Sequence, residues 1–191
     1  MHTIGLSLAS LLLTTTPQIN APAPTYTLTV ALFNDARVSP TVLAGAQETA
    51  SYIFSKSGIR IHWMLCGRED ESPEERSACS RPEFPNHLDV HIVRGGPRLP
   101  ISVFGISYLS PAGIGSQADV FYSRIAAFRE SSPQAELQVL LGYAIAHELG
   151  HLLLGLNSHS PTGLMRPIGV PRISWTWHTE DLVSVRSKRE Q

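Results

Sequence analysis

The sequence predicts an α+β fold in which a mixed β-sheet packs against a buried helix. Three observations lead to this class. The 191 residues are enough for one domain with a hydrophobic core, and two full domains of this total length would be small. Hydrophobic residues make up 42% of the chain and charged residues 16%, as is typical of folded proteins. Segments with strand-like and helix-like patterns are arranged as strand, helix, several strands and a long apolar helix.

The first two elements have clear boundaries in the sequence. Residues 25–33 alternate in character and are β-rich, which predicts a strand. Ser39 and Pro40 form a typical helix start, and apolar residues then recur at helical spacing. Ser57 and Gly58 end this helix.

Four further strands are expected. The segments are 59–65, 88–94, 101–110 with a bulge at Gly105, and 118–125. A charged loop separates the first two of them. Together with residues 25–33 they would form one sheet.

The second helix is expected to run from Ser132 and Pro133 to about Leu154. It is apolar on nearly all sides, and a helix without a polar face must be buried. A last short helix is expected at 178–187. The polar side chains of the long helix should therefore lie inside the fold.

Residues 1–24 resemble an export signal followed by a linker. Ile4 to Leu13 form an apolar core of the usual length, too short to span a bilayer, and small residues and prolines follow. The remaining residues, 25–191, are expected to be the mature domain, secreted or periplasmic.

Cys66 and Cys79 are the two cysteines and flank the charged loop. In an exported protein such a pair predicts one disulfide, and a metal site is the weaker alternative because no Cys-x-x-Cys spacing is present. The net charge of −1 and a pI of about 6.7 give no basic face for nucleic acid or, once the signal is removed, for a membrane. The mature protein is expected to be a monomer.

The segment HELGH at 147–151 carries the chemistry of the predicted site. His147 and His151 are four residues apart, so on a helix both rings leave the same face and can bind one Zn²⁺. Glu148 lies about 100° round the helix, where it can take a proton from a zinc-bound water. Burial of an unpaired charged group in an apolar helix costs free energy. The presence of two histidines and a glutamate there favours a zinc site, in which they have partners.

A catalytic zinc site needs a third protein ligand and an open position for water. Gly155 is expected to end the helix, and a sharp turn there would bring His159 toward His151. The alternatives are that His159 is a surface-loop residue, or that the third ligand comes from later in the chain, from Glu180, Asp181 or His178.

These residues resemble the metzincin clan of zinc metallopeptidases, whose signature is H-E-x-x-H-x-x-G-x-x-H followed by a methionine turn. Gly155 falls one position later than the signature glycine and His159 two positions later than the signature histidine. Met165 is similar to the methionine beneath the metal. The pattern after the helix is also similar to that of exported bacterial zincin-like proteins. The resemblance implies a zincin-like domain and a substrate that lies along an edge strand, here 101–110 or 118–125.

The function predicted from these patterns is a zinc-dependent endopeptidase acting on peptides or proteins. One catalytic Zn²⁺ would be held by His147, His151 and His159, with Glu148 as general base and acid. Two alternatives stay open. One is an extracellular module that binds zinc without catalysis. The other is a gluzincin-like peptidase with an acidic third ligand near Glu180.

Overall fold

The computed structural model describes residues 26–80 and 86–167. The elements in chain order are β1 (Tyr26–Phe33), α1 (Pro40–Ser55), β2 (Ile59–Cys66), α2 (Pro73–Cys79), β3 (His87–Val93), β4 (Gly105–Tyr108), β5 (Gln117–Phe121), α3 (Tyr122–Ser131) and α4 (Leu137–Leu154). The α+β class is confirmed. The export signal expected at 1–24 and the short helix expected at 178–187 lie outside the described residues.

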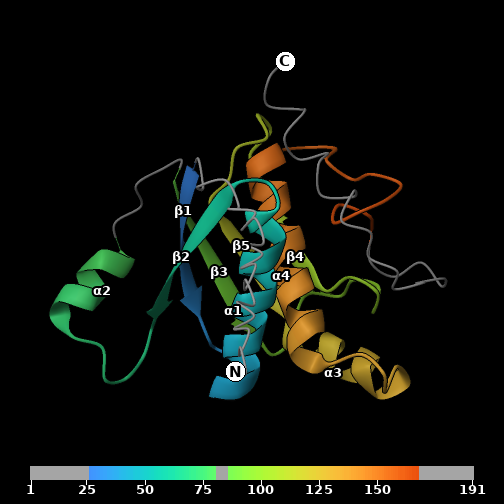
Figure 1. The fold of residues 1–191 in the computed structure, drawn as a ribbon, viewed down its shortest axis with the longest axis horizontal. Helices are drawn as coiled ribbons and strands as arrows, with labels where there is room; N and C mark the ends of the chain where they lie inside the picture. Colours follow the sequence, from blue (N-terminus) through green and yellow to red (C-terminus); the bar gives the residue numbers. More distant parts are fainter. Residues whose placement is uncertain (1–25, 81–85, 168–191) are drawn as a thin grey trace, which may run out of the picture.

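The five strands form one mixed sheet in the order β2-β1-β3-β5-β4. All neighbouring pairs are parallel except β4 and β5, which are antiparallel. The order places β2 at one edge of the sheet and β4 at the other. The helices α1 and α4 lie side by side against the sheet, whereas α2 lies apart from them, past β2 on the left of the view (Figure 1). The expected edge strand was either 101–110 or 118–125. Of these two, the strand at the edge of the sheet is β4, within 101–110.

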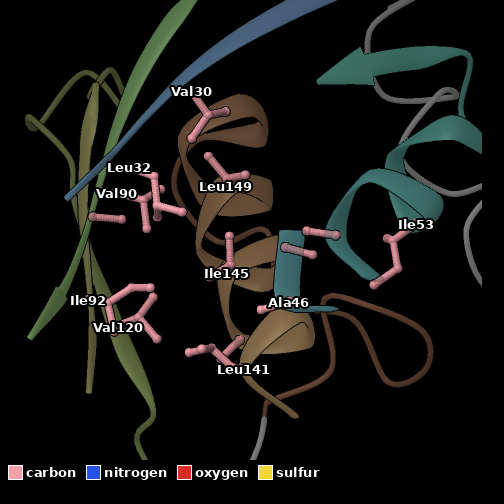
Figure 2. Packing of buried hydrophobic residues seen from close by; sticks show 14 of the residues in the cluster. Val30, Leu32, Ala46, Ile53, Val90, Ile92, Val120, Leu141, Ile145 and Leu149 are labelled. Atoms are coloured by element: carbon pink, nitrogen blue, oxygen red, sulfur yellow. The ribbon is translucent and has the colours of Figure 1, made fainter. Parts of the chain in front are cut away.

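The hydrophobic core lies between the sheet and these two helices. Figure 2 shows valine, leucine and isoleucine side chains of the sheet facing Leu141, Ile145 and Leu149 of α4. The side chains of Leu141, Ile145 and Leu149 are fully buried. Leu28, Val30 and Leu32 of β1 are all fully buried and, at a period of two, share one face of the sheet; Ala31, on the other face, is fully buried as well.

The packing of α4 against both layers explains its apolar composition. The helix is long and apolar enough to cross a membrane, but 61% of it is buried inside the fold. It also approaches α1 closely, since a Cβ at Gly142 would lie 2.7 Å from the Ala46 carbonyl oxygen. The predicted burial of this helix is therefore confirmed, and α4 is a core helix.

The disulfide between Cys66 and Cys79 is confirmed, with the two Cα atoms 5.9 Å apart. Its presence is consistent with an oxidising compartment. The intervening segment is not only a loop, as expected, because α2 forms within it. Ser72 and Glu75 cap this helix reciprocally, a serine-x-x-glutamate pattern that was readable in the sequence.

Two of the strand predictions extended too far. The strand expected at 101–110 is limited to β4, because the chain turns before it, where the Val103 N–H donates to the Pro100 carbonyl at 3.0 Å. The Arg124 guanidinium also donates to the Val103 carbonyl, at 2.8 Å. No bulge occurs at Gly105, where β4 begins. The strand expected at 118–125 ends at Phe121, and the chain continues directly into α3.

The start of the long helix was also placed too early. Ser132 and Pro133 were expected to begin it, but α4 begins at Leu137, after a turn in which Ala135 N–H donates to the Ser132 carbonyl. Ser132 follows the end of α3. The serine-proline pair therefore belongs to the connection between two helices, and the predicted end at Leu154 is confirmed.

Candidate metal centre

The C-terminus of α4 turns sharply and returns the chain toward the helix. Gly155 has a φ of 78°, the left-handed region that favours glycine, and its N–H donates to the His151 carbonyl at 2.9 Å. Asn157 also has a positive φ, 56°. These two residues bring Ser158 and His159 back over the last turn of α4.

The three predicted histidines come together at this turn. The Nε2 atom of His151 lies 3.1 Å from Nε2 of His147 and 3.1 Å from Nε2 of His159. One ring nitrogen from each residue lies within 4.8 Å of those of the other two. The turn at Gly155 thus delivers His159 to the pair on the helix, in spite of its late position in the sequence.

Two of the rings are oriented by hydrogen bonds from their other nitrogen. His147 Nδ1 lies 2.8 Å from the Leu164 carbonyl oxygen, which can only accept, so Nδ1 carries the proton. In the neutral ring Nε2 then has a free lone pair, the form that binds a metal. His151 Nδ1 lies 2.7 Å from Ser158 Oγ. Ser158 and the Leu164 carbonyl were not foreseen from the sequence.

The protonation of this group also favours metal binding. Burial lowers the pKa of His147, and burial together with the neighbouring histidines lowers the pKa of His151 to about 4. Both rings are therefore neutral at neutral pH. A metal competes with protons for the same nitrogen, so a neutral ring is already in the ligating state.

The donor set fits a zinc ion. In a tetrahedral site with Zn–N distances of about 2.0–2.1 Å, two nitrogen ligands are about 3.3 Å apart. The two Nε2 separations of 3.1 Å are close to this value. Ser158 Oγ can accept a hydrogen bond from His151 Nδ1–H, and in that tautomer Nε2 of His151 is free to bind a metal. The three nitrogens can hold zinc and leave a fourth position on the pocket side.

Met165 lies next to the same part of α4. Its side chain is 5% exposed, and its Sδ occupies the space that a Cβ at Gly150 would need, at 2.4 Å. The Ser160 N–H donates to the Met165 carbonyl at 3.0 Å, which closes the turn. The turn around Met165 therefore supports the helix between His147 and His151, and its Leu164 carbonyl orients one of the rings.

Glu148 lies beside the histidines and is 6% exposed. Burial raises the pKa of its carboxyl to about 7, although a hydrogen bond from Ser107 acts in the opposite direction. The edge strand approaches this side chain closely, since a Cβ at Gly105 would lie 2.6 Å from Glu148 Cγ. Glycine at the start of β4 thus makes room for the carboxylate.

A pocket of about 250 Å³ opens over these groups. Its walls come from the 102–109 segment and from α4, and its lining includes all three histidines and Glu148. The other lining residues in the described part of the chain carry no ionisable side chain: Ser102, Val103, Phe104, Gly105, Ile106, Ser107, Leu109 and Pro167.

Other polar residues of the strands lie away from this pocket. The Tyr108 hydroxyl donates to Asp119 Oδ2 at 2.7 Å, and neither residue lines the pocket. The group formed by Cys66, Glu71 and Cys79 is held by the disulfide, so its sulfurs are not thiolate ligands. The rival third ligands Glu180, Asp181 and His178 lie outside the described residues.

Comparisons with known proteins give a limited result. No protein-family model and no curated protein match the chain. Among solved structures, a zinc-dependent peptidase from Methanocorpusculum labreanum (strain Z) is similar in structure, with a TM-score of 0.46 and 19% sequence identity over 83% of this chain and 94% of that chain. A likeness at this level does not by itself assign an activity, so the functional case depends on the residues of the site.

Proposed function

We propose that this protein is a zinc-dependent endopeptidase in which His147, His151 and His159 hold one zinc ion. The observation that carries the proposal is the convergence of three imidazole nitrogens next to a buried carboxylate, in a pocket on the edge of the sheet. A structural zinc site has four protein ligands and needs no carboxylate beside them. The open pocket side and Glu148 therefore support catalysis over a purely structural role.

Zinc bound here would polarise the scissile carbonyl and make a water molecule more acidic. Glu148 accepts the proton of the attacking water and then donates it to the leaving amine. The apolar walls around the carboxylate limit the water around the reacting groups.

An extended peptide is the substrate that the edge strand fits. The Phe121 N–H donates to the Phe104 carbonyl at 2.7 Å, and this bond shows which residues of the antiparallel pair are hydrogen-bonded to each other. Hydrogen-bonded residues alternate along an antiparallel strand, so the backbone groups of Ile106 face β5. The backbone N–H and C=O groups of Gly105 and Ser107 then face the free edge of the sheet. A peptide adding to that edge would run along the pocket.

The pocket also favours a particular side chain next to the scissile bond. Val103, Phe104 and Leu109 supply apolar surface, and the lining formed by residues 26–80 and 86–167 presents no fixed cation or second carboxylate to a substrate side chain. An uncharged residue of moderate size would fit the volume of about 250 Å³. We propose further that the protein is exported as a monomer and acts on peptides or unfolded proteins.

The test is cleavage of a peptide library by the purified protein, with zinc, with a chelator, and after zinc is restored. Cleavage should require zinc and should favour uncharged residues at the scissile bond. Glu148→Gln should keep zinc and lose at least about a thousandfold in kcat/KM, since it removes the general base.

The matched control is Glu48→Gln, the same change at an exposed position of α1. This variant should cleave as the wild type does. If Glu148→Gln kept full activity, the mechanism would be wrong. If the zinc-loaded wild type cleaved nothing, the protein would be a zinc-binding module without this activity.

A further inference from the structure

Ser107 of β4 contacts the proposed general base directly. Its Oγ lies 2.7 Å from Glu148 Oε2 and 2.9 Å from the Glu148 backbone carbonyl. A hydroxyl has one proton, so it donates to one of these oxygens at a time. The backbone carbonyl lies inside α4, where a helical N–H can satisfy it. The carboxylate is therefore the acceptor that depends on Ser107.

Within residues 26–80 and 86–167, Ser107 supplies the hydrogen bond that the Glu148 carboxylate receives from a side chain. The surroundings restrict the carboxylate further, because the backbone of Gly105 lies against Cγ and Oε1. One oxygen is thus fixed by the hydroxyl. The other is confined beside the edge strand, next to the pocket.

We propose that Ser107 is a positioning residue that holds the Glu148 carboxylate in the orientation needed for proton transfer. The inference rests on the proposed peptidase function. Ser107 has a second connection to the substrate, because its backbone groups face the free edge where the peptide would pair. The same residue thereby fixes the base relative to the substrate strand, through its side chain and its main chain respectively.

A positioning role for Ser107 predicts that its removal changes the turnover rate and not the binding of substrate or zinc. Removal of the hydroxyl leaves the backbone edge and the histidines unchanged, so substrate affinity and zinc content are preserved. The carboxylate loses its fixed rotamer, and misplacement of a reacting group by about 1 Å can cost about a hundredfold in rate. A serine that only satisfied buried polar groups would affect stability and not this balance.

The kinetic test compares Ser107→Ala, Ser107→Thr and the control Ser51→Ala. Ser51 also forms a part-buried hydrogen bond between side chains, with Trp63 at 2.8 Å, and lies on α1 away from the pocket. Ser107→Ala should lower kcat by about 30–100-fold with KM within about threefold and zinc content unchanged. Ser107→Thr retains a hydroxyl and should recover most of kcat. The proposal is overturned if Ser107→Ala behaves as Ser51→Ala does, or if the loss lies in KM or zinc content.

A second readout does not depend on activity. In metal-free protein at pH 8.5, Ser107→Ala should lower the urea midpoint in the wild-type background, and by less than half as much in a Glu148→Ala background. Equal shifts in the two backgrounds would show that the contact is absent and overturn the proposal. Coupling together with a zinc-loaded wild type that cleaves nothing would instead reject the peptidase function, and with it the proposed positioning role of Ser107 in proton transfer.

Discussion

Replacement of Glu148 by glutamine should stabilise the metal-free protein while removing its activity. The Glu148 residue is 6% exposed, and burial raises the pKa of its carboxyl from 4.5 to about 7. One pKa unit corresponds to about 1.4 kcal/mol, so the charged form costs roughly 3 kcal/mol of folding free energy. Glutamine has the same shape and carries no charge.

The sign of the pH dependence follows from the raised pKa. Below pH 4.5 the carboxyl is protonated in both the folded and the unfolded chain, and the favourable contribution is fully present. As the pH rises through about 7 the folded chain also loses the proton, and the contribution is lost. The glutamine variant should therefore exceed the wild type by less than about 1 kcal/mol at pH 5 and by roughly 3 kcal/mol at pH 8.5.

Urea unfolding with a chelator present measures both differences directly. For a chain of this size the effect at pH 8.5 corresponds to a Tm increase of roughly 6–12 °C. His147 and His151 titrate in both proteins, so their contributions largely cancel in the comparison. The control Glu48→Gln should change stability by less than about 0.5 kcal/mol at either pH. A glutamine variant no more stable than the wild type at pH 8.5, or a difference independent of pH, would refute the claim that burial of the charged carboxyl outweighs its hydrogen bond from Ser107.

The remaining predictions concern the turn after α4 and the disulfide. His159→Ala should lower zinc affinity by more than about a hundredfold in a chelator competition. The control is His62→Ala, at an exposed position on the opposite face of the sheet, which should leave the affinity unchanged. An unchanged affinity in His159→Ala would exclude His159 as a ligand. Ser158→Ala should weaken zinc by about 10–100-fold because His151 Nδ1 loses its partner, and an unchanged Kd would contradict that role. Replacement of Cys66 and Cys79 by alanine should lower the free energy of unfolding by about 3 kcal/mol while the folded fraction keeps its kcat/KM, measured by urea unfolding and peptide cleavage. A loss of activity per folded molecule would connect α2 to the site.

The sequence predicted the elements with strong periodicity. The apolar composition of α4 required burial, the positions of His147 and His151 required a shared face, and Gly155 required a turn. These are local properties, so one segment of sequence was enough to predict them. The capping pattern at Ser72 that begins α2 was equally local and was overlooked.

The features that sequence did not predict depend on contacts between distant segments. Arg124 donates to the Val103 carbonyl, just before β4 begins, and the sequence around Val103 does not indicate this contact. Ser107 reaches Glu148 across 41 positions of the chain. Ser158 stands next to a predicted ligand, but its bond to His151 depends on the path of the turn. Periodicity carries no information on such pairings.

Zinc K-edge X-ray absorption on the full chain tests the central claim most directly, because it counts imidazole ligands around the metal. The site formed by His147, His151 and His159 predicts one zinc with three imidazole nitrogens at about 2.0–2.1 Å and one further oxygen ligand. Two imidazoles with a protein carboxylate, a fourth protein ligand in place of the open position, or no bound zinc would contradict it.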